Sequence, residues 1–277
     1  VANICNANNV AMNAVSTGFV DKGYDFGSGK VHPMKAVKVA LLTGEGVSSL
    51  GAGEVWHFFE KELGYPITLI NAADIGRAQW SDIDVLIMPD GNYRFLSDKG
   101  SSEQFTLWIR NGGRVVALES AAGQLSRQDW SAIQAKKEEK DSTAKKDPYA
   151  ALKVFNDRDR DGIENTTPGS IFRVDVDSSH PLMYGYPNYY YTLKMDNVLY
   201  EFTKDGAGWN AGVLKKDNQL AGFVGYKLKK KLKDGLLFAT QGLGRGSVTY
   251  LVDDVLFRNF WENGKLMFCN AVFMVGQ

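Results

Sequence analysis

An alternation of strand-like and helix-like segments between residues 38 and 119 is the feature that most constrains what this chain can fold into. Four short runs of β-forming residues span 38–44, 67–70, 84–91 and 114–119, and the first is a continuous apolar run closed by Gly44, as in a strand buried on both faces. Segments 53–63 and 102–113 place apolar residues at helical spacing, and Gly64 is a typical helix stop. Strand, helix and strand joined by short links predict a mostly parallel sheet with helices on both faces.

The second half of the chain is richer in strand-like segments, which we expect at 171–176, 198–202, 211–214, 221–228, 236–240 and 247–254. A last helix is expected at 265–275. Residues 1–36 are rich in Asn and Gly and lack sustained periodicity, apart from a helix-like stretch from Val10 to Val15. We therefore expect a leader or linker over 1–36 and one α/β domain over 37–277, with a charged insertion at 130–165.

The charge and composition of the 277 residues exclude several classes of protein. Thirty-two basic residues balance thirty-two acidic ones, so no nucleic-acid partner is expected, because phosphate backbones require a basic excess or stripe. No apolar run approaches the roughly 18 residues of a membrane span. Cys5 and Cys269 exclude a disulfide scaffold and leave open one bridge or two free thiols. Because the chain begins at Val1, we expect a processed protein or a piece of a longer one.

Two motifs resemble ligand sites but favour structural roles. Gly44 and Gly46 follow the first strand, as in a nucleotide-binding loop, yet the third glycine and the lysine of such loops are missing, so a strand-to-helix turn is favoured. His57, Glu60 and His180 are ligand types of a catalytic zinc site. His57 lies among aromatic residues and His180 precedes a proline, so we interpret this set as a false match made of packing and turn residues.

Two charged segments have similar alternatives. Asp157, Asp159 and Asp161 alternate like the opening of a calcium loop, but Pro168 stands where such a loop needs a bidentate glutamate, so a charged surface loop is favoured. The segment Lys227–Lys233 combines lysine with leucine. We interpret it as a solvated hairpin or lid, with a weak anionic partner as the minority alternative.

The most informative motif is the junction that follows the strand at 114–119. Ser120 stands there, where hydrolytic α/β folds expose a nucleophile on a strand-to-helix elbow beside helix N–H donors. Gly91, after the neighbouring strand, could supply a second donor to an oxyanion. The junction therefore predicts the position of a nucleophile.

A general base for this serine is not evident. The last predicted strand ends with Asp253 and Asp254, with no histidine near them. Glu119 beside the serine and Glu45 from the first loop remain as candidates to assist. The sequence thus predicts an elbow without an obvious base.

The runs VALLTGEGVSSLGAGEVWHFFEKELGYPITLI, DVLIMPDGNY and GGRVVALESAAGQL, in this order, resemble a class I glutamine amidotransferase-like domain. More narrowly, they resemble the version that follows the catalytic domain of bacterial zinc carboxypeptidases of the Bacteroidetes type. PGSIFRVDVDSSHPLMYGYPNYYYTL, GRGSVTYLVDDVLFRNFW and KLMFCNAVFM fit the same picture. The resemblance therefore runs from about Lys38 to Gln277.

This resemblance implies a flavodoxin-like three-layer α/β fold with a mostly parallel sheet and extra antiparallel strands in the C-terminal half. In the amidotransferases the elbow nucleophile is a cysteine backed by a histidine and a glutamate. Ser120 matches the elbow here, and the other two positions are not recognisably filled. The resemblance also implies that zinc belongs to an upstream catalytic domain and that this chain itself holds no cofactor.

We therefore expect a non-catalytic accessory domain of a secreted or periplasmic zinc carboxypeptidase-like protein. Its partners would be its own upstream peptidase domain, a second copy of the chain, or a peptide or glycan. The expected ligand-facing residues at the ends of the strands are Glu45, Gly91, Asn92, Tyr93, Ser120 and Ala121. The run Tyr189–Tyr191 would add an aromatic contact surface, or else ordinary strand packing.

Two alternatives remain open. One is a serine hydrolase that uses Ser120 with help from Glu119 or Glu45. The other is a zinc peptidase in its own right.

Overall fold

The computed structural model describes residues 1–276 except 32, 138–148, 150–151 and 153, so much of the predicted charged insertion lies outside the described residues. The chain divides into two compact units, Val1–Ala36 and Val37–Gly276. The first unit contains the helix α1 (Ala2–Ala7). The helix predicted from Val10 to Val15 is wrong, because Asn9 takes a left-handed conformation (φ 53°) directly after α1 and the following residues are not helical.

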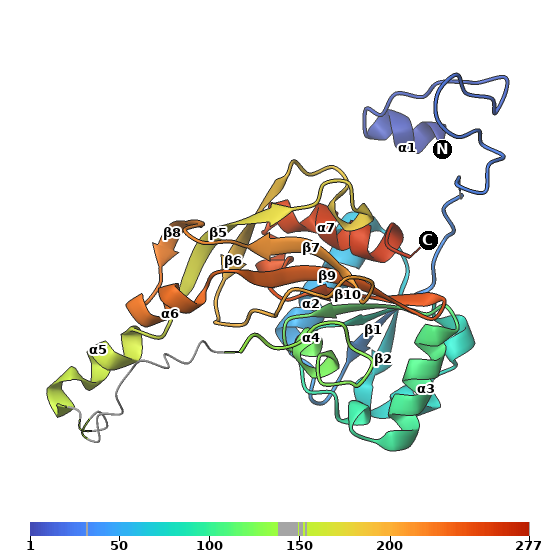
Figure 1. Ribbon diagram of the computed structural model, residues 1–277. Helices are drawn as coiled ribbons and strands as arrows, with labels where there is room; N and C mark the ends of the chain where they lie inside the picture. The colour runs from blue at the N-terminus through green and yellow to red at the C-terminus, as the bar shows by residue number, and fades with distance from the viewer. Residues whose placement is uncertain (32, 138–148, 150–151, 153, 277) are drawn as a thin grey trace. The chain divides into compact units, whose positions relative to one another are not determined.

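One sheet dominates the second unit (Figure 1). Its strands in the described part of the chain are β1 (Val39–Thr43), β2 (Ile67–Asn71), β3 (Val85–Met88), β4 (Arg114–Leu118), β5 (Gly169–Val176), β6 (Tyr189–Lys194), β7 (Trp209–Leu214), β8 (Gln219–Phe223), β9 (Gly235–Leu243) and β10 (Gly246–Leu251). They follow the order β2-β1-β3-β4-β10-β9-β7-β5-β6, with β8 paired to β5. The pairs from β2 to β10 are parallel, and those from β10 onward are antiparallel.

The parallel half follows the apolar runs of the sequence. The central strands β3 and β4 are buried at every position, as predicted for strands covered on both faces. Strand β2 lies at the sheet edge and exposes several side chains. In the antiparallel half, β9 and β10 form a hairpin in which Leu243 pairs with Gly246. The carboxyl ends of β3, β4 and β10 therefore lie at the same edge of the sheet.

Helices cover both faces of this sheet. They are α2 (Ser49–His57) with a π-helical continuation (Phe58–Leu63), α3 (Lys99–Arg110), α4 (Ser120–Leu125) and α7 (Glu262–Phe273). Two shorter helices, α5 (Arg158–Ile163), which buries no side chain, and α6 (Tyr226–Lys231), lie beside the sheet (Figure 1). Helices α3 and α7 lie on opposite sides of the sheet (Figure 1). Phe58 and Phe59 pack edge-on against Phe268 of α7, whereas Phe105 of α3 stacks with Trp108. The result is a three-layer, flavodoxin-like α/β fold with an antiparallel extension.

Four further predicted elements, all in the second unit, differ from the structure. Residues 198–202 do not form a strand, and Tyr200 makes only isolated bridges. The strand in this part of the chain is β6, which comes earlier, at Tyr189–Lys194. The predicted strand 221–228 ends at Phe223 and gives way to α6, so the hairpin or lid expected at Lys227–Lys233 is also wrong. The segment expected to be a charged loop around Asp159 forms α5.

Two further observations concern the cysteines and the membrane. Cys5 and Cys269 are both free thiols. Within the described residues, no helix has the length and apolar character that crossing a bilayer requires.

Gly246 at the start of β10 tests how tightly the hairpin packs on α3. A Cβ there would lie 2.1 Å from the carbonyl oxygens of Gly113 and Ile109, and backbone cannot easily move. We expect Gly246→Ala to lower the free energy of unfolding by about 1–3 kcal/mol, as overpacking does. Urea unfolding measures the change.

Gly242, on the β9 side of the same hairpin, provides the control. Nothing lies within 4 Å of its Cβ position. Gly242→Ala should therefore leave the free energy of unfolding unchanged or raise it by about 0.5–1 kcal/mol. Equal losses in the two variants would contradict the packing argument.

Candidate functional site

The elbow between β4 and α4 is formed by Glu119, one residue before the Ser120 that the sequence indicated. Glu119 has φ 49° and ψ −120°, a conformation that non-glycine residues rarely adopt. Its backbone N–H donates a 2.8 Å hydrogen bond to the carbonyl oxygen of Leu251 in β10, which fixes the turn. The residue at the nucleophile position therefore carries a carboxyl group.

Ser120 joins the end of β4 to the loop after β3. Its hydroxyl donates to the Asp90 carboxylate and accepts from the backbone N–H of Gly91 (2.9 Å). Gln124 of α4 strengthens this link, because its Oε1 accepts from the Tyr93 N–H at 2.7 Å. The Gly91 N–H is thus already used by the serine and does not point at an incoming oxyanion.

The other expected ligand-facing residues lie in different surroundings. Tyr93 is buried, and its hydroxyl donates to the Pro89 carbonyl oxygen (2.7 Å). Ala121 is fully buried. Asn92 is exposed, and Glu45 is exposed and pairs with Arg94 at 3.9 Å. None of these four lines the cavity described next, among the residues that the structure describes there.

A cavity of about 810 Å³ opens beside the elbow. Its described lining comes from α2 and the residue before it, from the ends of β3, β4, β6 and β10, and from the segment that follows β10: Ser48, Ser49, Leu50, Gly51, Gly53, Glu54, His57, Asp90, Glu119, Leu193, Met195, Asp196, Asp253, Asp254, Phe257, Arg258 and Asn259. The carboxyl ends of parallel strands are where open α/β sheets bind ligands. We therefore take this elbow cavity as the candidate functional site.

Carboxyl groups dominate the elbow cavity. Burial, and then the charges of Asp254 and Asp90, raise the pKa of the Glu119 carboxyl to about 8. Burial, and then the charge of Glu54, raise the pKa of Asp254 to about 7, and Asp254 also shares a hydrogen bond with Glu54. Both groups therefore exchange protons near neutral pH, since carboxyls disfavour ionisation when they are desolvated beside like charges.

Backbone strain gathers at the same cavity. Three of the six non-glycine residues with positive φ in the described part of the chain line it: Glu119, Arg258 (φ 49°) and Asn259 (φ 56°). The Arg258 N–H donates to Glu54 (2.9 Å), which holds the strained segment against α2. Such strain persists where the surrounding structure enforces it, commonly at functional sites.

A buried ion cluster supports the far wall of the cavity. The Lys194 ammonium on β6 is fully buried and lies 2.6 Å from Asp253, with Asp196 as a second partner. Burial alone would lower the pKa of Lys194, but the charges of Asp253 and Asp196 outweigh it and raise that pKa. Thr192 donates a further hydrogen bond to Asp253 at 2.6 Å. These contacts fix the end of β6 against the segment after β10.

The sequence interpretation of His57 as a packing residue is wrong. Its side chain is exposed and lines the elbow cavity. Its Nδ1 accepts a 2.8 Å hydrogen bond from Asn259, whose amide also donates to Glu62 at 2.5 Å. The sequence gives no signal of this role, because His57 stands in the middle of the helix predicted over 53–63 and ends α2 only in the structure.

The residues of the zinc-like motif have separate roles. Glu60 is exposed and pairs with Lys61. His180 accepts the Leu182 N–H at Nδ1 (3.1 Å) and stacks on Trp209. Over the described residues, no group of three or more His, Cys, Asp or Glu side chains is placed to hold a metal ion. His57, Glu60 and His180 therefore make separate contacts with different partners.

Comparisons with known proteins support the fold. No protein-family model matches the chain, and no curated protein matches it in sequence. Solved structures do match. A ThuA-like protein from Bacteroides uniformis is 13% identical, with 92% of this chain and 94% of that chain covered and a TM-score of 0.51. A ThuA-like protein from Parabacteroides merdae is 13% identical, with 86% and 89% covered and a TM-score of 0.52.

A third similar structure, a GMP synthase component from Thermoplasma acidophilum, is 11% identical, with 87% of this chain and 94% of that chain covered and a TM-score of 0.50. Identities this low show the fold alone. The domain accordingly has a glutamine amidotransferase-like, ThuA-like α/β fold of the flavodoxin-like type.

The raised pKa of Glu119 predicts a pH-dependent stability. Between about pH 4.5 and 8 the folded protein holds a proton on Glu119 that the unfolded chain releases, so this group lowers the free energy of unfolding as the pH rises. Glu119→Gln removes this titration. The variant should match the wild type at pH 5 and exceed its stability by roughly 2–4 kcal/mol at pH 9.

Urea unfolding at pH 5, 7 and 9 measures this difference. Glu45→Gln serves as the control, because the Glu45 side chain is 84% exposed and should leave the pH profile parallel to that of the wild type. A Glu119→Gln profile parallel to the wild type would contradict the raised pKa.

Proposed function

We propose that this chain is a non-catalytic accessory domain of a secreted or periplasmic zinc carboxypeptidase-like protein, and that its elbow cavity binds a ligand without turning it over. The carrying observation is Glu119, which occupies the elbow in place of a thiol or hydroxyl. With a pKa of about 8, its carboxyl is largely protonated at neutral pH and is a poor nucleophile.

The order of the resembling segments supports the assignment to such a parent protein. The zinc and the peptide hydrolysis would then belong to the upstream catalytic domain, and this chain would pack on that domain, form a dimer, or bind a fragment. Its own histidine and glutamate residues do not form a zinc site within the described residues. The order of the resembling segments and the separate contacts of the histidine and glutamate residues both agree with an accessory role.

The chemistry of the elbow cavity favours a peptide with a basic side chain over a glycan. Glu54, Asp254 and Glu119 line it, and carboxylates pair with ammonium and guanidinium groups. Sugar rings usually stack on Tyr or Trp, whereas Phe257 and His57 are the ring-bearing side chains among the described lining residues. We therefore propose that a Lys or Arg side chain of a peptide enters the cavity.

A serine hydrolase centred on Ser120 is the second candidate. Its support is the hydrogen bond from the exposed Ser120 hydroxyl to Asp90, which could accept a proton. The same hydroxyl accepts the Gly91 N–H, so the expected oxyanion donor is already engaged. We favour the binding role for this reason.

A fluorophosphonate probe discriminates between these two candidates. We expect no covalent labelling of the wild-type chain, and mass spectrometry of the intact protein reads this directly. Labelling of the wild type that disappears in Ser120→Ala would replace the binding role with the hydrolase. Labelling that persists in Ser120→Ala would show that another nucleophile is present and would also contradict the proposal.

Binding of a basic peptide should strengthen as the pH rises. Asp254 and Glu119 gain negative charge between pH 6 and 8.5, while a lysine side chain remains charged. We expect N-acetyl-Ala-Ala-Lys amide to bind roughly ten times more tightly at pH 8.5 than at pH 6, which corresponds to about 1.4 kcal/mol. Isothermal titration calorimetry measures both affinities.

Two comparisons make this test specific. N-acetyl-Ala-Ala-Glu amide should not bind, and Glu119→Gln should reduce the gain with pH, while Glu45→Gln should keep it. Equal binding of the Lys and Glu peptides, or no binding of either, would contradict the proposed ligand.

A further inference from the structure

A second pocket, which has mostly apolar walls, lies on the antiparallel extension of the sheet. Its volume is about 430 Å³, and its described lining consists of Ile171, Tyr191, Leu220, Ala221, Trp261, Glu262 and Asn263. Leu220 is 57% exposed and Tyr191 is 38% exposed, so these side chains border an open hollow. Contiguous apolar surface that remains exposed commonly marks a place where a partner binds. This apolar pocket is therefore a candidate binding site.

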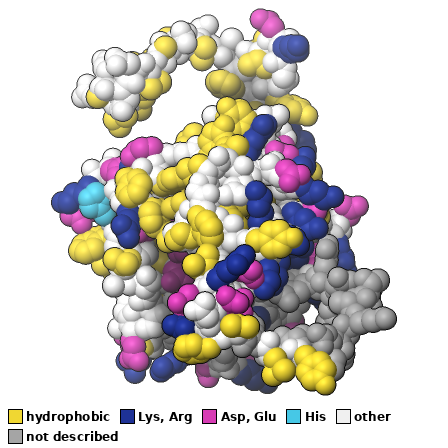
Figure 2. All heavy atoms as spheres, turned by 90° about the vertical axis from the view of Figure 1, so that its left-hand side faces the viewer, with side chains coloured by type: hydrophobic (Ala, Val, Ile, Leu, Met, Phe, Trp, Pro, Cys, Tyr) yellow, Lys and Arg dark blue, Asp and Glu magenta, His cyan; other side chains and the backbone are white. Residues whose placement is uncertain are grey.

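Three strands and the start of α7 bring these residues together. Ile171 of β5 stands opposite Leu193 of β6 on one side and opposite Ala221 of β8 on the other. The side-chain amide of Asn263 donates a 2.8 Å hydrogen bond to the carbonyl oxygen of Tyr191, which holds the first turn of α7 against β6. Figure 2 looks onto the side of the domain where β8 lies and shows hydrophobic side chains gathered there. The apolar pocket is therefore built by the packing of four elements on one another.

The apolar pocket adjoins the elbow cavity along β6. Tyr191 lines the pocket, whereas Leu193, two positions further along the same strand, lines the elbow cavity. Side chains two positions apart on a strand point to the same face and lie roughly 6.6–6.8 Å apart. The segment after β10 makes the same connection, because Asn259 lines the elbow cavity and Trp261 lines the pocket. The two hollows are therefore neighbours on one surface, with carboxyl groups in one and apolar walls in the other.

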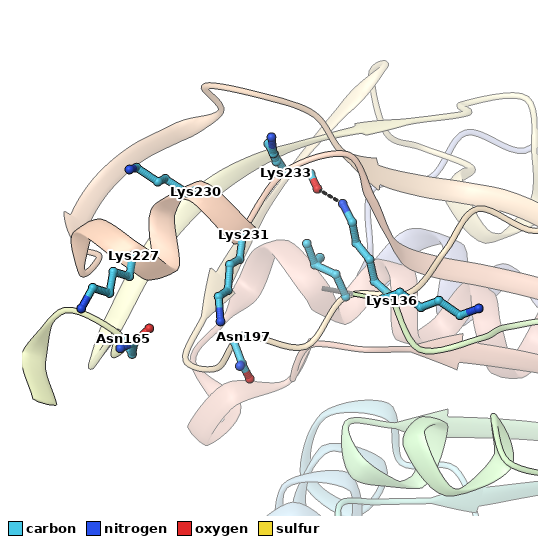
Figure 3. A pocket seen from close by; sticks show the side chains of 9 residues that line it. Lys136, Asn165, Asn197, Lys227, Lys230, Lys231 and Lys233 are labelled. Atoms are coloured by element: carbon cyan, nitrogen blue, oxygen red, sulfur yellow. Dashed lines mark hydrogen bonds between the residues drawn. The ribbon is translucent and has the colours of Figure 1, made fainter. Parts of the chain in front are cut away.

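The lysines of α6, which follows β8, are engaged by other contacts. Lys227 pairs with Glu164 at 2.5 Å, and the Lys230 ammonium lies 4.0 Å from the centre of the Tyr226 ring. Figure 3 shows the hollow beside α6, where the side chains of Lys227, Lys230 and Lys233 point apart. The charged site that adjoins the apolar pocket is therefore the elbow cavity, on the β6 side.

We infer that the apolar pocket binds a large apolar side chain of the same peptide whose Lys or Arg side chain enters the elbow cavity. This inference rests on the proposed function and adds a second recognised residue, two positions from the basic one. In an extended peptide, side chains at this separation share one side and have the same spacing as Tyr191 and Leu193. A second copy of the chain fits less well, since a stable interface takes about 20–30 residues a side and seven described residues line this pocket.

Isothermal titration calorimetry of the full chain at pH 8.5 tests the inference. The probes are N-acetyl-Leu-Ala-Lys amide and N-acetyl-Lys-Ala-Leu amide, which present the two residues in opposite orders, and N-acetyl-Ala-Ala-Lys amide as the reference. We expect at least one leucine peptide to bind about fivefold or more tightly than the reference, because its leucine leaves water for the apolar pocket. Asparagine, which has nearly the shape of leucine but is polar, should remove the gain when it replaces the leucine.

The reference peptide separates this inference from the proposed function. Binding of N-acetyl-Ala-Ala-Lys amide with no gain from leucine in either order would overturn the role of the apolar pocket and leave that of the elbow cavity in place. Absence of binding of all the lysine peptides would overturn both.

Leu220→Gln tests the pocket from the side of the protein. It should reduce the gain from leucine to less than twofold and leave the affinity for N-acetyl-Ala-Ala-Lys amide unchanged, because Leu220 does not line the elbow cavity. Leu107→Gln on α3 is the matched control, since Leu107 is 59% exposed, Leu220 is 57% exposed, and Leu107 lies outside the pocket. Circular dichroism verifies that both variants fold. A leucine gain that persists in Leu220→Gln, or that is lost equally in both variants, would overturn the inference.

Sedimentation velocity tests a second copy of the chain as the occupant. We expect the wild type and Leu220→Gln to sediment equally. A wild-type dimer that dissociates in Leu220→Gln and persists in Leu107→Gln would assign the apolar pocket to a second copy and overturn the inference.

Discussion

The contact between Lys194 and Asp253 is the constraint on which the elbow cavity depends. Strand β6 lies four strands away from β10 in the sheet order, yet Lys194 at the end of β6 meets Asp253 directly after β10. The antiparallel half must therefore curl back over the ends of the parallel strands. Because removal of one partner of a buried pair costs about 3–5 kcal/mol, this closure is strongly held. The far wall of the cavity, including Asp196, follows from it.

The parallel half could be predicted from sequence because its inner strands β1, β3 and β4 are buried on both faces and are therefore largely apolar. Strand β6 could not, since its buried positions include Thr192 and Lys194. Polar residues at inward positions remove the hydrophobic pattern, and the tyrosines before them suggest a surface. Helix α6 was missed because it is short and its lysines outnumber its buried leucine. Charge that is satisfied by distant partners cannot be recognised from local sequence.

The candidate site was partly predictable in the same sense. Glu119, Asp253 and Asp254 could be named because they stand at the carboxyl ends of predicted strands, and these ends meet at one edge of a parallel sheet. Glu54 and His57 were missed, because which face of α2 meets the cavity depends on how the helix packs. The elbow itself was displaced by one residue, since the hydroxyl of Ser120 indicated chemistry while the backbone conformation at Glu119 decides the geometry.

The strained turn at Glu119 has a consequence for how this domain could be modified. The backbone already presents residue 119 as a nucleophile elbow does, and the hydrogen bond to Leu251 keeps it so. The backbone at position 119 thus has the conformation of a nucleophile elbow, although the side chain there is a carboxyl group and not a nucleophile. A thiol introduced by Glu119→Cys would stand in the same cavity as His57, which makes this fold a starting point for installing a nucleophile with a single substitution.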